Sequence, residues 1–406
     1  MPKLQDLSYN SIKSNYKRIY FVKALNRWLI DDLYIFNNAS DFSLLLLRNP
    51  QEFLKRDINI LLKSKLNILV KPFRYKINLS EIWFVLVFFV SNINKFYGWY
   101  NFVVGVKSLI WFLLIDKRVF LKTESIHCEF ATQTILISIL INKYFQRDIS
   151  LYYTVHAHDI FFKNKWLSYI SRNTEKCFTI SKYNKNYLAD HYKITNKHIK
   201  VIYAGVNISE NQNTIQNDNS YRIGFLSNLI KKKGIKYLLE AFVQFLQVNE
   251  NARLIIAGSG PLKNEIEEYI IQEKLSDNVL MLGRIDENEK INFFKSIDVF
   301  VLPSTSEKND MDGIPKVLRE AVNFNVPIIS TNISGIPEIC IDRVTGILVN
   351  EKSVNDILYA LNRIKNDDEL LMSIEKNGKR FLKSKFDNFD NIKLKLKSMG
   401  WMYNLL

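Results

Sequence analysis

Residues 303–327 read PSTSEKNDMDGIPKVLREAVNFNVP, and this stretch decides the expected fold. A strand-like run at residues 299–302 precedes it, and beyond Gly313 the apolar residues recur at the three-to-four spacing of one buried helix face. A polar loop that leads into a helix N-terminus collects unpaired backbone N–H groups and partial positive charge. The stretch therefore predicts an anion-binding turn between a strand and a helix.

Two acidic residues stand at the two ends of this turn and helix. Asp312 and Glu320 have seven residues between them. This spacing places one carboxylate at the mouth of the helix and the other about two turns deeper. Beside a bound phosphate, such carboxylates suit sugar hydroxyl groups. On spacing alone, the commoner explanation is an acid at a helix N-terminus and a solvated glutamate.

The sequence around these acids resembles a known signature. DGIPKVLREA, then NVPIISTNISGIPEIC and TGILV, resemble in order the blocks of glycosyltransferase family 4, the retaining nucleotide-sugar glycosyltransferases of the GT-B fold. The resemblance covers residues 122–400. It implies an α/β fold with two Rossmann-like domains facing across a cleft and a C-terminal helix that crosses back to the first domain. Asp312 stands where the family has Glu, and this DGIP form resembles the subset that makes colanic-acid-type exopolysaccharides.

Length and composition fit two domains. A chain of 406 residues with 47% hydrophobic content exceeds one ordinary core, so two domains of about 200 residues each are expected. With the roles that the resemblance implies, we expect an acceptor-binding domain at residues 1–207, a nucleotide-sugar-binding domain at 208–385 and a returning helix at 386–406. Three cysteines lie far apart with no C-x-x-C pair, which disfavours disulfides or a zinc site and fits a reducing compartment.

The net positive charge of the chain lies in its first half. Residues 1–200 hold 30 Lys and Arg against 14 Asp and Glu, whereas the remainder holds 26 against 27. A basic half indicates nucleic acid, anionic lipid or an anionic acceptor as partner, and no nucleic-acid-binding motif accompanies it. We therefore expect the inner face of a membrane and a lipid-linked or anionic saccharide acceptor as partners, and no nucleic acid.

The apolar runs do not predict a membrane-spanning segment. The sequence starts without an apolar signal region, and the run at residues 82–90 is too short to cross a bilayer. This run and another at 103–115 are expected to be core strands or helices. Trp83, Trp99 and Trp111, with neighbouring lysines, make contact with one membrane leaflet the alternative. We expect a cytoplasmic protein, with peripheral attachment to the cytoplasmic face of the membrane as a further expectation.

Histidines follow an expected strand in the first half. Residues 122–161 read as strand, helix and strand, and the second strand ends at His156-Ala-His158-Asp159. Polar residues beyond a strand's carboxyl end lie where open α/β sheets bind ligands, although a surface or core histidine pair fits equally well. The resemblance implies that His156 faces donor sugar and acceptor, with His158 and Asp159 lining the acceptor side. A metal site would need a third ligand nearby, and the sequence indicates none.

The second half repeats the pattern of strand, loop and helix. A lysine run leads to Gly234, which opens a helix with one apolar stripe, and on its own this run reads as a solvated turn. In the resembled family, this loop carries an Arg and a Lys that neutralise the donor diphosphate. Lys233 matches the Lys, whereas Asn228 stands in place of the Arg. A neutral amide cannot offset charge as a guanidinium does, so either Lys231 or Lys232 compensates or donor binding is weaker.

Two further loops complete the expected donor side. Residues 253–262, RLIIAGSGPL, form a strand that ends in a G-x-G without the third glycine of a dinucleotide fingerprint. Gly258 and Gly260 instead match the family's G-x-G-P loop. Gly283 and Arg284 match the element whose backbone contacts the nucleotide base in the family.

The resemblance implies transfer of a hexose from a nucleoside diphosphate sugar, with a UDP-sugar favoured, to a lipid-linked saccharide with retention at the anomeric carbon. A helix N-terminus and a lysine can stabilise the leaving diphosphate, so we expect neither a cofactor nor a metal ion. The residues expected to act are Lys233 on the diphosphate, Asp312 on donor-sugar hydroxyls, Glu320 on ribose hydroxyls and His156 at the sugar, with the backbone of Gly313, Ile314, Pro315 and Val317 beside the phosphates.

Two alternatives stay open. Asp310-Met-Asp312 is a D-x-D, the metal–diphosphate clamp of transferases with the GT-A fold, although that clamp usually lies earlier in the chain. The other alternative is a GT-B relative that has lost catalysis and serves as a partner subunit. Asn228 and Asp312 point that way, as does the lack of the family's glycine-rich opening loop, since the first glycine is Gly98.

Overall fold

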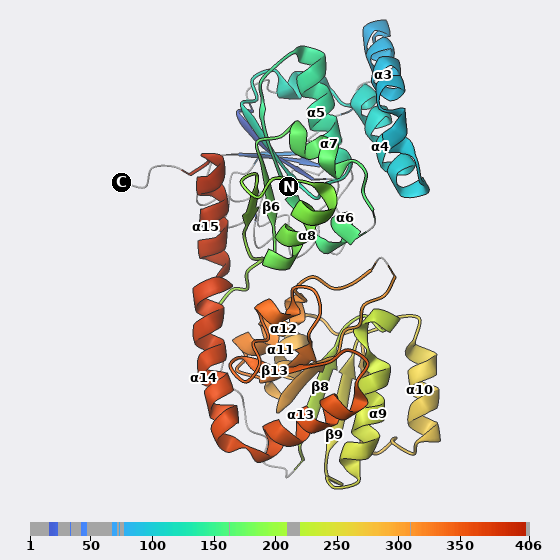
Figure 1. The fold of residues 1–406 in the computed structure, drawn as a ribbon, viewed down its shortest axis with the longest axis vertical. Coiled ribbons are helices and arrows are strands. Elements are labelled where there is room, and N and C mark those ends of the chain that lie inside the picture. Colours follow the sequence, from blue (N-terminus) through green and yellow to red (C-terminus); the bar gives the residue numbers. More distant parts are fainter. Residues whose placement is uncertain are drawn as a thin grey trace, which may run out of the picture. The chain divides into compact units, whose positions relative to one another are not determined.

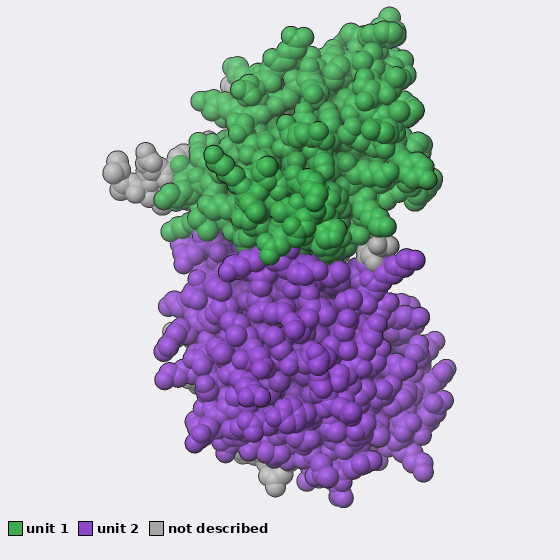
Figure 2. All heavy atoms as spheres, in the orientation of Figure 1, with its two compact units in different colours: residues 1–180, 184–202, 392–406 green, residues 181–183, 203–391 purple. Residues whose placement is uncertain are grey.

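The chain forms two compact units, which Figure 2 shows in two colours. The computed structural model describes residues 16–22, 33, 42–46, 67–70, 73, 77–161, 163–208, 220–308 and 310–402. Unit 1 comprises residues 1–180, 184–202 and 392–406, and unit 2 comprises residues 181–183 and 203–391. The boundaries expected at residues 207 and 385, and the roles given to the two domains, stay predictions.

Unit 1 is built on a parallel sheet whose described strands run in the order β3-β2-β1-β4-β5-β6-β7 (Figure 1). The strands are β1 (Arg18–Val22), β2 (Ser43–Leu46), β3 (Asn67–Val70), β4 (Ser125–Glu129), β5 (Ser150–Val155), β6 (Lys176–Thr179) and β7 (Ile199–Val201). All side chains of β2 and β4 are buried, as expected for parallel strands covered on both faces. Because β4 and β5 pair in parallel, their carboxyl ends meet at one edge of the sheet.

Helices cover this sheet, and the last helix of the chain joins it. They are α3 (Leu79–Ser91), α4 (Trp99–Leu114), α5 (Gln133–Phe145), α6 (Ala157–Phe161), α7 (Leu167–Arg172) and α8 (Lys182–Tyr192). From Ile392 onward, helix α15 (Asn388–Met399) belongs to unit 1. Trp401 Nε1 donates to Ser125 Oγ at 2.8 Å, and Lys200 Nζ donates to Ser398 Oγ at 2.6 Å. These contacts fasten the C-terminal segment to strands that come much earlier in the sequence.

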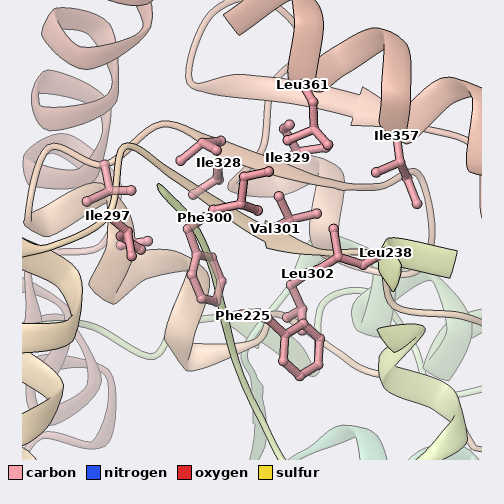
Figure 3. Close-up of a cluster of buried hydrophobic side chains, with 14 of the residues drawn as sticks. Phe225, Leu238, Ile297, Phe300, Val301, Leu302, Ile328, Ile329, Ile357 and Leu361 are labelled. Carbon is pink, nitrogen blue, oxygen red and sulfur yellow. The ribbon is translucent and has the colours of Figure 1, made fainter. Parts of the chain in front are cut away.

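Unit 2 contains a second parallel sheet, with its described strands in the order β10-β9-β8-β11-β12-β13. The strands are β8 (Arg222–Leu226), β9 (Arg253–Ala257), β10 (Val279–Gly283), β11 (Val299–Leu302), β12 (Ile328–Thr331) and β13 (Gly346–Val349). The helices are α9 (Ile235–Leu246), α10 (Lys263–Gln272), α11 (Glu287–Lys295), α12 (Lys316–Asn323), α13 (Val354–Asn366) and α14 (Asp368–Lys385). Figure 3 shows side chains of α9 and α13, such as Leu238 and Leu361, with Val301 and Leu302 of β11 in the core of this unit.

The sheet of unit 2 has a topological switch point between β8 and β11. From β8 the chain continues outward through β9 to β10, and it then returns to the other side of β8 to build β11, β12 and β13. The loops that leave the carboxyl ends of β8 and β11 therefore turn in opposite directions. Open α/β sheets bind ligands in the crevice that such a divergence creates. The quoted stretch at residues 303–327 begins at this point.

Gly234 allows the loop after β8 to pack tightly against the loop after β11. Its φ is +68°, and a Cβ placed there would lie 1.8 Å from the carbonyl oxygen of Pro303. Only glycine avoids that clash and adopts this left-handed conformation without strain. The backbone N–H of Thr305 also donates to the carbonyl of Lys232 at 2.8 Å. The two loops are thus held together by backbone contacts.

The apolar runs at residues 82–90 and 103–115 fall largely in α3 and α4, and the expectation that the first run is a buried core element is wrong for the outward side of α3. The inward side of α3 does pack, with the ring of Phe84 5.5 Å from that of Phe112. The outward side is open, however, since Trp83 is 70% exposed and Val90 is 69% exposed. A helix that is apolar all round needs covering on every side, and these neighbours cover only one. Within the described residues, no helix is long and apolar enough to cross a membrane.

Candidate active site

Lysines from the loop after β8 meet carboxylates from the loop after β11 at the switch point of unit 2. Lys233 Nζ donates to both carboxylate oxygens of Asp312 at 2.8 Å. Ser304 Oγ donates to Asp312 Oδ2 at 2.7 Å. Beside this pair, Lys232 Nζ donates to Asp310 Oδ1 at 2.8 Å. Two residues predicted from the sequence, Lys233 and Asp312, are therefore direct neighbours.

The Lys233–Asp312 pair is shielded but retains capacity to bind a ligand. Asp312 is 8% exposed, and the Lys233 side chain is 14% exposed. A carboxylate accepts up to four hydrogen bonds and an ammonium carries three donors, so each group can hold the other and still contact a further polar group. Because both are largely removed from water, their charges act through a lower effective dielectric than surface charges do. The pair can thus present a fixed positive and a fixed negative charge to a polar ligand.

The turn before α12 supplies backbone donors next to these side chains. Gly313 lies in a bend, Ile314 is 7% exposed, and Pro315 is the residue before the first helical residue, Lys316. Backbone N–H groups in the first turn of an α-helix, including that of half-buried Val317, have no acceptor within the helix. They carry the partial positive charge of the helix N-terminus. A turn before a helix N-terminus thus lies where the sequence predicts one, and anion binding there stays a prediction.

Glu320 is buried on α12 and is held by a lysine that the sequence did not indicate. Glu320 is 9% exposed, and Lys290 Nζ of α11 donates to its Oε1 at 2.8 Å. Lys316 Nζ lies 3.5 Å from the same oxygen. Burial would lower the pKa of Lys290, but the charges and hydrogen bonds of Glu320 and Glu287 outweigh burial and raise it. Lys290 therefore stays charged and fixes Glu320 away from bulk solvent.

The predicted glycines build the rim of the same edge through close backbone packing. A Cβ at Gly258 would lie 1.8 Å from the carbonyl oxygen of Ser227, and one at Gly260 would lie 2.5 Å from that of Leu229. The Gly258 N–H donates to the carbonyl of Gly283 at 2.7 Å. These contacts bring together the loops after β8, β9 and β10. The two predicted side chains on this rim, Asn228 and Arg284, are exposed.

A second polar cluster lies at the carboxyl edge of the sheet in unit 1, around Glu129. His156 Nε2 lies 2.8 Å from Glu129 Oε1, and Lys395 Nζ donates to Oε2 at 3.0 Å. The Tyr20 hydroxyl donates to Oε2 at 2.5 Å. Burial alone would raise the pKa of Glu129, but Lys395 and His156 hold it well below its usual value. An ionised carboxylate only accepts hydrogen bonds, so the contact with His156 requires a proton on Nε2.

The two remaining residues predicted for the acceptor side differ in their surroundings. Asp159 is fully buried, and its Oδ2 accepts a hydrogen bond from the His156 backbone N–H at 3.0 Å. Its own N–H donates to the His156 carbonyl at 3.0 Å, so Asp159 shapes the turn that carries His156. Burial raises the pKa of this carboxyl group, although His156 partly opposes the effect. His158 is exposed, with its ring 6.2 Å from that of Tyr100.

Sequence reasoning missed the partners of the predicted residues. Glu129 stands at the carboxyl end of β4, next to the strand that ends before His156, and this shared strand-end position is a signal that was available. Lys290 lies on α11, and only packing places it against Glu320. Lys395 lies 266 residues from Glu129 in the sequence. No local pattern could have joined those two.

Comparison with models of known protein families identifies two matching regions in the chain. The model for "Glycosyl transferases group 1" matches residues 207–381, and the model for "Glycosyltransferase Family 4" matches residues 100–210. Each model covers less than half of the chain, and together the two match residues 100–381. The resemblance to glycosyltransferase family 4 inferred from residues 303–349 is thereby confirmed. The group 1 region lies on unit 2, and most of the family 4 region lies on unit 1.

Several curated proteins are similar to parts of this chain. An uncharacterized glycosyltransferase of Methanocaldococcus jannaschii is 31% identical over 57% of this chain and 62% of its own length. CapM, a capsular polysaccharide biosynthesis glycosyltransferase of Staphylococcus aureus, is 28% identical over 45% of this chain and 46% of its own. WcaL of Escherichia coli K12, named for colanic acid biosynthesis, is 34% identical over 35% and 36%. The chain thus matches less than two thirds of the length of each.

Solved structures establish the fold of this chain. HepE of Anabaena, in complex with UDP and glucose, superposes with a TM-score of 0.67 at 16% identity over 95% of this chain and all of that one. A glycosyltransferase from Rickettsia africae superposes with a TM-score of 0.66 at 16% identity over 95% and 98%. These neighbours have the GT-B fold. The fold class expected from the sequence is confirmed.

Proposed function

We propose that this protein transfers a hexose from a nucleoside diphosphate sugar to a saccharide acceptor during synthesis of a surface polysaccharide, with retention at the anomeric carbon. The observation that carries the proposal is the meeting of Lys233, Asp312 and the N-terminus of α12 at the switch point of unit 2. A UDP-sugar is the favoured donor, since the neighbour HepE was solved with UDP and glucose. The names of CapM and WcaL support a polysaccharide product.

In this proposal the charges of unit 2 stabilise the leaving diphosphate. When the bond between the anomeric carbon and the diphosphate breaks, negative charge develops on the phosphate oxygens. Lys233 and the first-turn N–H groups of α12 are donors held in place before the reaction, which is the arrangement that stabilises a developing anion best. Asp312 would accept hydrogen bonds from donor-sugar hydroxyls, and Glu320, positioned by Lys290, would accept them from the ribose. Gly283 and Arg284 would lie beside the base.

His156 is the candidate group of unit 1 for the sugar and the acceptor. Its ring is fixed from two sides, by Glu129 at Nε2 and by the ring of Phe130, whose centroid lies 4.7 Å away. The contact with Glu129 fixes the orientation of the imidazole, which His156 would need in order to contact the donor sugar.

Lysine pairing favours metal-independent transfer over the D-x-D alternative. Asp310 and Asp312 each accept hydrogen bonds from a lysine ammonium, Lys232 and Lys233 respectively. A divalent cation bound between these carboxylates would have to displace two positive charges or lie next to them. Transfer that continues in EDTA is therefore expected, and complete loss of transfer that returns with added Mg²⁺ or Mn²⁺ would favour the metal clamp instead.

The acceptor is proposed to be lipid-linked and to lie at the cytoplasmic face of a membrane. The first half of the chain has a net charge of +16, which suits an anionic lipid surface or a diphosphate-linked acceptor. A partner subunit without catalysis is the second candidate function. Exposed Asn228, in place of the family's Arg, favours it, because Lys232 is already paired with Asp310.

One experiment separates these functions. The purified chain is mixed with a panel of nucleotide sugars, and both its Tm and the release of nucleoside diphosphate are measured. We expect a nucleotide sugar with one base to raise the Tm and to be hydrolysed slowly or transferred to an added saccharide. A raised Tm without any turnover would support the partner subunit. No stabilisation by any nucleotide sugar would contradict the proposal.

A further inference from the structure

Helices α3 and α4, joined by the short helix η3 (Ile93–Phe96), carry a large exposed apolar surface on unit 1. On α3 the exposed apolar residues follow helical spacing along one side. This α3–α4 surface consists of Leu79, Ile82, Trp83, Leu86, Val87, Val90, Ile93, Tyr97, Trp99, Phe102 and Ile110. Figure 1 shows the two helices together at the edge of unit 1. A contiguous apolar surface of this kind on a folded unit marks a place where something else binds.

These residues are exposed because the opposite side of α3 packs against the rest of unit 1. On the inward side of α3, the ring of Phe88 stacks on Trp166 at 6.4 Å and Phe84 contacts Tyr144 at 5.4 Å. Glu81, which is 1% exposed, lies 3.2 Å from Lys117 Nζ. The inward side is thus fixed by rings and a buried ion pair. The outward side, where Leu79 is 84% exposed, cannot turn inward without breaking these contacts.

Charges around the α3–α4 surface are of one sign. Residues 77–122 contain two acids, Glu81 and Asp116, and both are buried against cations of the same segment. Lys95, Lys107 and Lys122 are the remaining cations of the segment. Three more cations lie beside this segment. Lys143 Nζ is 6.0 Å from the ring centroid of Tyr169, and Lys165 Nζ is 4.4 Å from that of Tyr97. The third is Arg172, whose charge, together with burial, lowers the pKa of Lys95. The apolar surface therefore has a basic margin.

We propose that the α3–α4 surface lies in the interface of an anionic membrane leaflet, with its apolar side chains among the acyl chains and its lysines at the lipid phosphates. Trp and Tyr residues such as Trp83, Tyr97 and Trp99 are the side chains that favour this depth, because they combine an apolar ring with a polar group. Helix α3 has 13 residues and is about 20 Å long, against a hydrocarbon core of about 30 Å, so it lies in the leaflet rather than across it.

Charge also distinguishes a membrane from a second copy of the chain. In a two-fold dimer the same surface meets itself, so the cations at its margin would face one another. No acid of residues 77–122 is available to pair with them, since both are buried and paired. An anionic leaflet, in contrast, supplies a phosphate for each lysine. The surface fits the membrane better than it fits itself.

Vesicle sedimentation of the full chain tests the proposal. The vesicles are phosphatidylcholine alone or equal parts phosphatidylcholine and phosphatidylglycerol. The variant Leu86→Glu/Val90→Glu places two carboxylates at positions that are 52% and 69% exposed, so the fold should tolerate them. The control Val248→Glu/Ile271→Glu makes the same charge change at positions of unit 2 that are 75% and 69% exposed. We expect wild type and control to sediment with the anionic vesicles and the α3 variant to bind at least about tenfold more weakly.

Further measurements distinguish a failure of the α3–α4 surface from a failure of the donor site. The inference deepens the proposed function by placing the acceptor at the membrane, but vesicle binding does not require transfer. The Tm shift caused by UDP is therefore recorded for all three proteins; loss of that shift speaks against the donor site and not against the surface. Equal sedimentation of wild type and the α3 variant would overturn the proposal, as would no binding of wild type to anionic vesicles. A wild-type dimer that the α3 variant dissociates, without vesicle binding, would likewise overturn it.

Discussion

Replacement of Lys395 tests whether the C-terminal helix positions the histidine of unit 1. Lys395→Met keeps the aliphatic length of the side chain and removes the ammonium that lies 3.0 Å from Glu129 Oε2. Glu129 is 3% exposed, so its charge would remain in a place that water hardly reaches. Loss of one partner of a buried ion pair costs about 3–5 kcal/mol. Contacts of Glu129 with Tyr20 and His156 remain and offset part of that loss.

These contacts place the expected loss near the lower end, at about 3 kcal/mol. For a unit of about 200 residues, that lowers the Tm by roughly 6–12 °C. Calorimetry of the full chain measures the transition, and Glu129→Gln/Lys395→Met is the control, because it removes both charges and leaves no buried ion. The double variant should recover much of the lost Tm. If its loss equals the sum of the two single losses, the two residues do not interact and the reasoning is refuted.

The pH dependence of the same variant has a definite sign. The pKa of Glu129 in the folded chain is well below its ordinary value of 4.5. Its contribution to stability is therefore complete above about pH 4.5 and is lost as the pH falls through the folded pKa. Without Lys395 the pKa is lowered less, so the Tm difference between wild type and Lys395→Met should be full at neutral pH and should shrink in acid. A difference that grows on acidification would show that another group is responsible.

Three further variants test the site in unit 2. Lys233→Ala should lower turnover by about tenfold or more, because a donor to the leaving diphosphate is lost. The control is Lys236→Ala, at an exposed position of α9. A near-wild-type rate for Lys233→Ala would remove Lys233 from the mechanism. Glu320→Gln should weaken binding of the nucleotide sugar by about tenfold, since a hydrogen bond to a charged group contributes roughly 1.5–3 kcal/mol; an unchanged Kd in calorimetry would contradict the ribose assignment. Lys290→Met should also raise the Kd for the nucleotide sugar, because Glu320 would be displaced, and Lys295→Met is the control. Additive effects of Lys290→Met and Glu320→Gln would show that Lys290 does not act through Glu320.

The fold of unit 2 was predictable because local and global signals agree there. The apolar runs expected as strands within residues 253–262 and at 299–302 are followed by Gly258 and Pro303, and they appear in the sheet as β9 and β11. The first half was harder. Its runs at residues 82–90 and 103–115 are as apolar as a core strand, and periodicity cannot say whether a neighbour covers both sides of a helix. Only packing shows that Trp83 is exposed while Phe84 is covered.

The candidate site was predictable one residue at a time, but its pairings were not. Lys233 and Asp312 were recognised from separate motifs 79 residues apart, and their direct contact follows from the order of β8 and β11 in the sheet. Glu320 was expected to bind a ligand, and its lysine partner on α11 went unnoticed because a helix–helix contact leaves no mark in either sequence segment. The roles given to these residues stay predictions.

In unit 2, acids and lysines pair across neighbouring elements, so a substitution of one residue of a pair also affects its partner. Lys233 with Asp312 joins the loops after β8 and β11, and Lys290 with Glu320 joins α11 to α12. Charges fixed from two elements are held in place without a ligand, which is what electrostatic stabilisation of a leaving group requires. The same pairing means that Asp312→Asn would also release Lys233. A double-variant cycle of these two residues is therefore needed, in which non-additive losses of kcat/KM would show that they act as one unit.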